Sequence, residues 1–100
     1  MENQPKNPKD DNIIFVGAKA FMNYVTAVVM QFTTKQVPEV IVKARGKYIS
    51  KAVDVAEVAK HRFLDNTVET GNVQIGSEEF ENKEGKKVRV SILEIPLKKK

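Results

Sequence analysis

The sequence predicts an α+β fold in the order β-α-β-α-β-β, a single domain with two helices packed on a four-stranded mixed sheet and a protruding β-hairpin. Two observations support this prediction. Strand and helix periodicities alternate over residues 13–63, and two segments with period-two alternation surround a polar turn within residues 73–97. A chain of 100 residues has the length of one domain. We assign the polar residues 1–12 to a disordered tail and residues 13–100 to the domain.

Apolar spacing predicts the elements of the first half. Residues 13–16 are continuously apolar and end at Gly17, which predicts a short central strand covered on both faces. From Phe21 onward apolar residues recur at helical spacing, until Pro38 ends the pattern. Residues 40–44 then predict a second strand. Because a helix connects the two strands, we expect them to be parallel.

A second helix is predicted over residues 49–63. Its apolar stripe is rich in alanine, so the helix should lie close to the sheet. Val55 and Val58 fall partly or wholly off that stripe, and their exposure would indicate a second contact surface. Glu57 and His61 stand at the spacing of a helical surface pair, as do Lys51 and Asp54.

A long hairpin is predicted after a polar connection over residues 64–71. Residues 73–81 and 87–97 both alternate, and residues 82–86 form the turn between them. The distal half of the hairpin is almost wholly charged and cannot be buried, so its tip should project into solvent. Pro96 suits a sheet edge or the end of a strand.

A run of positive charge follows the second strand. Lys43 and Arg45 are two residues apart and share a strand face, while Gly46 can bend the chain so that Lys47 lies close by. A helix starting near Tyr48 would add free backbone N–H groups, which favour a bound anion. The segment predicts either a phosphate site or a solvated basic loop, and the residues alone do not decide between them.

Composition narrows the function. The net charge is +4 and the isoelectric point is near 9.4, which favours polyanionic partners. There is no cysteine, and His61 is the single histidine, so no nucleophile, general base or metal cluster can be named. We predict no enzymatic activity, no metal and no cofactor. No apolar run approaches membrane-spanning length, and a cytoplasmic protein without a membrane partner is the simplest expectation.

Several segments resemble the archaeal Alba proteins, also called the Sac10b family. The most specific is residues 41–54, where a lysine, an arginine, a glycine and a Ser-Lys-Ala helix start keep a fixed spacing. Similarity extends through residues 15–25, 62–64, 75–77 and 89–95. The resemblance implies an abundant chromatin protein of the nucleoid, a homodimer that binds double-stranded DNA largely without sequence preference and also binds RNA. It further implies hairpins that follow the minor groove.

The resemblance also implies which residues contact nucleic acid, and we add two lysines of the hairpin to the same set. The expected nucleic-acid-binding residues are Lys19, Lys43, Arg45, Lys47, Lys86, Lys87 and Arg89.

This chain departs from the family in the loop that carries Lys19. Many members have two adjacent lysines followed by proline, whereas here the sequence is Ala18-Lys19-Ala20. The missing cation should weaken binding. By resemblance Lys19 is the candidate for acetylation, and Phe63 matches an aromatic residue that joins dimers on DNA; a partly buried anchor at the helix end is the other interpretation of Phe63.

Two other functions stay open. RNA could bind the same positive face, with Phe15, Tyr24 or Tyr48 offering rings for stacking, although burial in the core is the commoner fate of Phe15. The second open function is that of an architectural module whose basic patch binds an acidic protein. Neutralising Arg45 and Lys47 would separate it from a nucleic-acid binder.

Overall fold

The computed structural model describes residues 12–100. The tail expected over residues 1–12 therefore lies outside the described residues, apart from Asn12. That residue is already tied to the sheet, because Asn12 Nδ2 donates a hydrogen bond to the Glu39 carbonyl at 2.7 Å. The Ile41 N–H also donates to the Asn12 carbonyl at 2.9 Å.

The predicted order of helices and strands is confirmed, with one strand added. The elements are β1 (Ile13–Val16), α2 (Phe21–Thr33), β2 (Glu39–Arg45), the 3₁₀ turn η1 (Gly46–Tyr48), α3 (Ile49–Val58), the π-helical turn η2 (Ala59–Phe63), β3 (Val68–Thr70), β4 (Gln74–Glu81) and β5 (Lys87–Lys99). The expected connection over residues 64–71 thus contains a short strand, and the sheet has five strands rather than four. Only Val68 of β3 is buried, which leaves too little pattern to detect.

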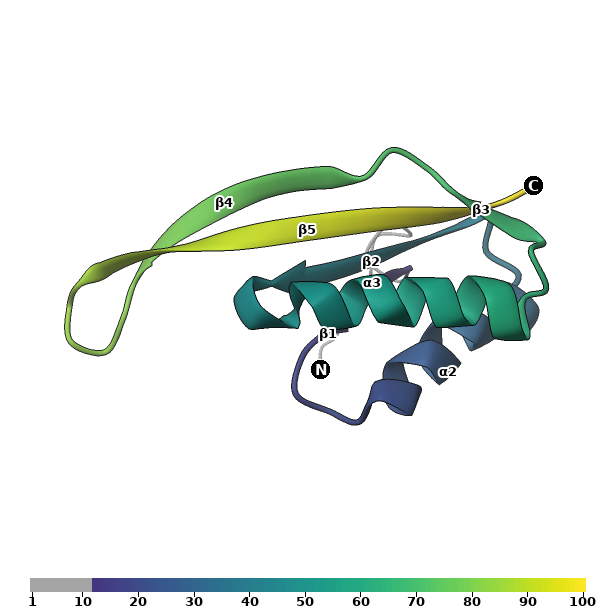
Figure 1. Cartoon of the computed structure of the whole chain (residues 1–100), viewed down its shortest axis with the longest axis horizontal. Helices are drawn as coiled ribbons and strands as arrows, with labels where there is room; N and C mark the ends of the chain where they lie inside the picture. Colours follow the sequence, from purple (N-terminus) through teal and green to yellow (C-terminus); the bar gives the residue numbers. More distant parts are fainter. Residues whose placement is uncertain (1–11) are drawn as a thin grey trace, which may run out of the picture.

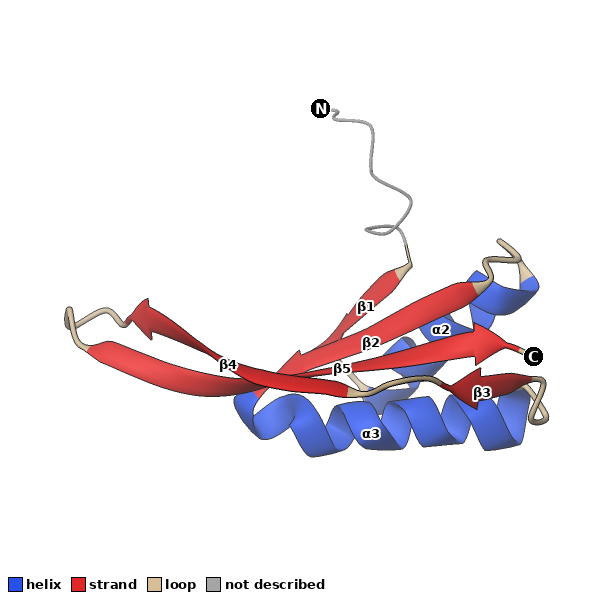
Figure 2. Ribbon diagram, turned by 90° about the horizontal axis from the view of Figure 1, so that it is seen from above, coloured by secondary structure: helices blue, strands red, loops and turns tan. Residues whose placement is uncertain are grey.

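The strands form one mixed sheet in the order β1-β2-β5-β3, and β4 pairs with the other half of β5. β1 and β2 are parallel as predicted, and the remaining pairs are antiparallel. The expectation that β1 is a central, doubly covered strand is wrong, because β1 lies at the sheet edge and Phe15 is 56% exposed. Both helices lie on the same side of the sheet, which leaves the other face open (Figure 2).

The alternation of buried and exposed residues along β2 shows which side chains face the helices and which face the open side of the sheet. Val40, Val42 and Ala44 are buried under the helices, so Lys43 and Arg45 project from the open face. In α3 the alanines of the predicted stripe are buried. Val55 and Val58 do not form the second contact surface that their exposure would have indicated: Val55 is 0% exposed and Val58 is partly buried against the core. Because α3 packs against α2 as well as the sheet, its buried sector is wider than one stripe.

The β4–β5 hairpin extends beyond the helices and curves away from the rest of the molecule (Figure 1), as its charge predicts. We call the projecting part, residues 74–91, the arm, and the remainder the body. Every residue of β4 is exposed.

Pro96 lies inside β5, not at an edge or a strand end as expected. Its carbonyl accepts a hydrogen bond from Gly71 at 2.8 Å, between β3 and β4. Since the N–H and C=O of an antiparallel residue point to the same side, the missing N–H of Pro96 faces this gap and costs no ladder hydrogen bond.

Candidate nucleic-acid interface

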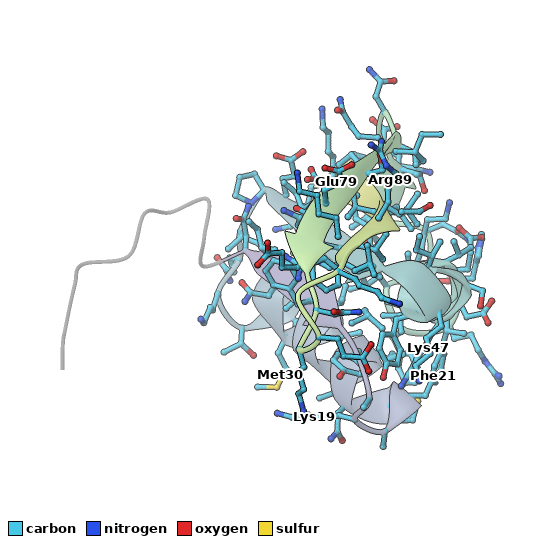
Figure 3. All side chains as sticks on the ribbon, turned by 90° about the vertical axis from the view of Figure 1, so that its left-hand side faces the viewer. Lys19, Phe21, Met30, Lys47, Glu79 and Arg89 are labelled. Atoms are coloured by element: carbon cyan, nitrogen blue, oxygen red, sulfur yellow. The ribbon has the colours of Figure 1, made fainter. Side chains whose placement is uncertain are left out.

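Positive side chains from two segments, the loop after β1 and the turn after β2, lie at one end of the body. The loop after β1, the start of α3 and the arm lie at the same end of the molecule (Figure 1). Figure 3 looks onto that end and shows Lys19 and Lys47 below the arm, which carries Glu79 and Arg89. We call Lys19, Arg45 and Lys47 the basic cluster.

The turn after β2 delivers two members of the basic cluster. Gly46 has φ +53°, and a Cβ there would lie 3.0 Å from Val90 Cγ2 on the arm. Glycine therefore allows the bend, as the sequence suggested, and it also allows the close approach of the arm. The helix start offers fewer free N–H groups than expected, because η1 precedes α3 and the Ile49 N–H donates to the Gly46 carbonyl.

Three of the predicted cations face carboxylates. Lys43 Nζ lies 3.2 Å from Glu94 Oε2, Arg45 Nε lies 3.2 Å from Glu78 Oε1, and Arg89 Nη2 lies 2.8 Å from Glu79 Oε2. The Arg45 and Arg89 pairs are largely exposed, with arginine side chains 61% and 66% accessible. Exposed ion pairs are worth about 0.2–1 kcal/mol, so phosphate can replace the carboxylate at small cost.

Lys43 is less available than the other cations. Its side chain is 27% exposed, and Nζ lies 5.2 Å from the centre of the Phe15 ring. The expected burial of Phe15 is wrong, because its side chain lies on the face of the sheet that the helices leave open. Tyr24 is buried and Tyr48 is half-buried, so Phe15 is the most exposed of the three rings considered for stacking.

The other predicted contact residues are exposed. Among the described residues, no acidic side chain pairs with Lys19, Lys47, Lys86 or Lys87. Lys47 Nζ lies 5.4 Å from the Tyr48 ring. The structure does not bring Arg89 into the basic cluster, because Arg89 and Val90 alternate along β5 and it is Val90 that approaches Gly46.

A hollow of about 460 Å³ separates the arm from the body beside the basic cluster. Its apolar lining includes Phe15 and Phe80, which are 56% and 52% exposed, and Arg45 and Lys47 contribute positive charge. The full lining is Phe15, Val16, Gly17, Ala44, Arg45, Gly46, Lys47, Tyr48, Phe80 and Val90.

Lys51 makes contacts that sequence reasoning missed. We expected it to pair with Asp54 along the helix, whereas Lys51 Nζ donates to the carbonyls of Gly17 and Lys19 at 2.7 and 2.6 Å. The signal that could have found this contact is a lysine in the first turn of a helix, where positive charge needs compensating acceptors. The other expected surface pair is confirmed, with Glu57 Oε1 3.1 Å from His61 Nε2.

Phe63, the predicted residue for contact between dimers, lies apart from the basic cluster. Phe63 ends η2 and is 51% exposed, at the opposite end of α3 from the basic cluster. Residues 12–100 contain no group of three or more His, Cys, Asp or Glu side chains that could hold a metal ion. In the same part of the chain, no helix is long and apolar enough to cross a membrane.

Comparison with known proteins identifies close relatives. The family model called Alba matches residues 12–77. The DNA/RNA-binding protein Alba of Methanocella arvoryzae is 52% identical over 90 residues, covering 90% of this chain and 92% of that protein. The protein of the same name from Methanococcus maripaludis is 47% identical over 87 residues, covering 87% of this chain and 97% of its own length.

Solved structures agree in fold. Alba from Thermoplasma volcanium superposes with a TM-score of 0.81 at 45% identity, covering 88% of this chain and all of the other. ALBA1 from Trypanosoma brucei superposes with a TM-score of 0.69 at 21% identity, covering 97% of this chain and 72% of that one. The second likeness concerns the fold alone.

Proposed function

Since this chain belongs to the Alba family, we propose that it binds double-stranded DNA without sequence preference, as a homodimeric chromatin protein of the cytoplasmic nucleoid. The observation that carries the proposal is the basic cluster: Lys19 from the loop after β1 and Lys47 from the turn after β2 lie at the end of the body below the arm, and Arg45 at the start of that turn pairs with Glu78 of the arm. Both curated relatives named above are called DNA/RNA-binding proteins.

The chemistry is the neutralisation of phosphate by exposed cations. Lys19 and Lys47 have no carboxylate to give up among the described residues, and Arg45 exchanges Glu78 for a phosphate oxygen. Phosphate contacts fix the position of a protein on a duplex without reading its bases. An arm in the minor groove distinguishes little beyond A·T from G·C, so sequence preference is slight.

A two-fold dimer doubles the basic cluster and makes a platform wide enough for a duplex. The half-exposed ring of Phe80 supplies apolar surface for contact between subunits. Phe63 is the surface for association between dimers, and acetylation of Lys19 would remove an exposed charge. Lys86, Lys87 and Arg89 on the arm add contacts farther along the duplex.

The salt dependence of binding tests the proposal. With about four phosphate contacts per subunit, the slope of log affinity against log salt is about −7 for a dimer. The double substitution R45A/K47A should reduce the slope to about −4 while the protein remains dimeric. K35A, which removes an exposed lysine just beyond the other end of α2, is the matched control.

A slope near −1, or a strong preference for one sequence, contradicts the proposal. Unchanged binding by R45A/K47A contradicts the assignment of the basic cluster. Binding that is lost in this variant, with the dimer intact, counts against a partner that is an acidic protein.

RNA is the second candidate partner, favoured by one specific observation. Phe15 presents a half-exposed ring on the open sheet face beside Arg45 and Lys47, which suits stacking of an unpaired base. Competition among matched duplex DNA, duplex RNA and single-stranded RNA at one salt concentration separates the two candidates. Preference for single strands that is lost in F15L supports RNA, and preference for the DNA duplex supports the chromatin role.

A further inference from the structure

Lys51 connects the start of α3 to the loop that carries Lys19. Its ammonium nitrogen lies 2.7 Å from the Gly17 carbonyl oxygen and 2.6 Å from that of Lys19. An ammonium has three N–H donors, so these two bonds use most of its hydrogen-bonding capacity. The rings of Tyr24 and Tyr48, centred 5.2 and 5.9 Å from the nitrogen, add cation–π contact.

Tyr24 makes a further contact with the same loop. The Lys19 N–H donates to Tyr24 Oη at 3.1 Å, and Tyr24 is 9% exposed. Both backbone polar groups of Lys19 are therefore held by the body, the N–H by Tyr24 and the C=O by Lys51. The Lys19 side chain is exposed, and no carboxylate among the described residues pairs with it.

The loop after β1 has few local hydrogen bonds from its own side chains to fix its conformation. Residues 17–20 are Gly-Ala-Lys-Ala and contain none of the short polar side chains that usually cap a turn or a helix. The residue before α2 is Ala20, which makes no side-chain cap hydrogen bond. The position of this loop thus depends on long-range contacts, and Lys51 supplies two of them.

We propose that Lys51 is a positioning residue of the interface: it fixes the loop through the Gly17 and Lys19 carbonyls so that the Lys19 ammonium is presented to phosphate, and it makes no phosphate contact itself. The inference depends on the proposed function, because it assigns how one cation of that interface is held. It gives Lys51 a different role from Lys43, Arg45 and Lys47, which lie near it in the sequence and are proposed to contact phosphate.

A double-mutant cycle tests this role. Duplex DNA binding is measured against salt for the wild type, K19A, K51M and K19A/K51M. We expect K19A and K51M each to weaken binding on the order of tenfold at 0.1 M salt, and each to reduce the slope by about 2 per dimer. The double variant should bind no more weakly than K19A, because Lys51 acts through Lys19.

The control is K60M, which removes another half-buried lysine farther along the same helical segment. Lys60 Nζ lies 3.1 Å from Thr70 Oγ1 and 3.7 Å from Glu57 Oε2, away from the basic cluster. K60M should leave both affinity and slope unchanged. Amide exchange at Lys19 should accelerate in K51M and stay slow in K60M.

A measurement on the unaltered protein covers the case in which K51M does not fold. The side-chain ammonium signals of lysine are followed by NMR as a DNA duplex is added. The Lys19 signal should shift with saturation of the duplex, and the Lys51 signal should keep its position.

The outcomes separate the two proposals. Multiplicative losses in the cycle, or a Lys51 ammonium signal that shifts as strongly as that of Lys19, mean that Lys51 contacts phosphate and overturn the inference alone. Wild-type affinity in K51M beside weakened K19A also overturns it alone. A wild-type protein that does not bind the duplex overturns the proposed function and this inference together.

Discussion

The body and the arm are held together by different forces. The body has a continuous apolar core in which Val42, Val55 and Leu97 are fully buried, and no charged side chain is buried among the described residues. The arm has no such core: all of β4 is exposed, and the backbone ladder between β4 and β5 holds its two strands together. Stability therefore depends mainly on the core of the body, whereas β4 of the arm presents its side chains to solvent.

The same two regions differ in their charges. On the body, Lys19 and Lys47 face solvent without a carboxylate partner in the described part of the chain. The arm contributes glutamates, and two of them pair with arginines, Glu78 with Arg45 and Glu79 with Arg89. Residues 74–91 carry four glutamates and four lysines or arginines, so the arm is neutral overall and offsets positive charge only locally, at Arg45 and Arg89.

The largest effect on stability should come from shortening a side chain in the core of the body. We expect L97A to lower the free energy of unfolding by about 2–5 kcal/mol, because Leu97 is 0% exposed in β5 and its loss leaves a cavity. I75A, at the base of the arm, removes a side chain that is 82% exposed and should change stability by less than about 0.5 kcal/mol. Urea unfolding at one protein concentration gives both values, and equal losses would show that the arm is covered by a partner.

A medium effect is expected where the body meets the arm. G46A must adopt φ +53° and bring its Cβ within 3.0 Å of Val90, so it should cost about 1–3 kcal/mol. G85A at the tip of the arm meets only the backbone strain of φ +79°, with nothing within 4 Å, and should cost about 1 kcal/mol. Thermal unfolding compares the two. If G85A is as costly as G46A, the approach of Val90 contributes nothing.

The smallest effect concerns the acidic side of the arm. E78Q and E79Q each release an arginine and should strengthen duplex binding about two- to fivefold at 0.1 M salt, in line with the strength of exposed ion pairs. E57Q, which alters a paired glutamate on α3, is the control and should bind like the wild type. Anisotropy titrations measure the change, and weaker binding by E78Q would mean that Glu78 orients Arg45 for its contact.

Periodicity explains why most of the fold could be predicted. The helices and the long hairpin repeat their apolar residues over many positions, and each was located to within a few residues. The bend at Gly46 was also predicted, since glycine beside two strand cations is a local signal. The family could be suspected because residues 41–54 combine several such signals at fixed spacing.

The errors have a common physical origin, since each depends on contacts between distant segments. Phe15 looks like a core residue until the sheet proves to be covered on one face only. Val55 looks exposed until α2 packs against α3. Pro96 looks like an edge residue, but it fits inside β5 because the position of its missing N–H faces the gap between β3 and β4. Lys51 appears to be one more surface cation until the loop at Gly17 lies against it.

The single strand β5 also has a mechanical consequence. It runs for 13 residues, about 44 Å at the rise of an antiparallel strand, and the whole molecule is 45 Å long. It pairs with β4 near the tip, and with β2 and β3 behind it. A pull on the tip is therefore transmitted along one continuous backbone and loads the ladder hydrogen bonds of the sheet in shear. We therefore expect a force on the tip of the hairpin to act on the whole sheet rather than on the hairpin alone.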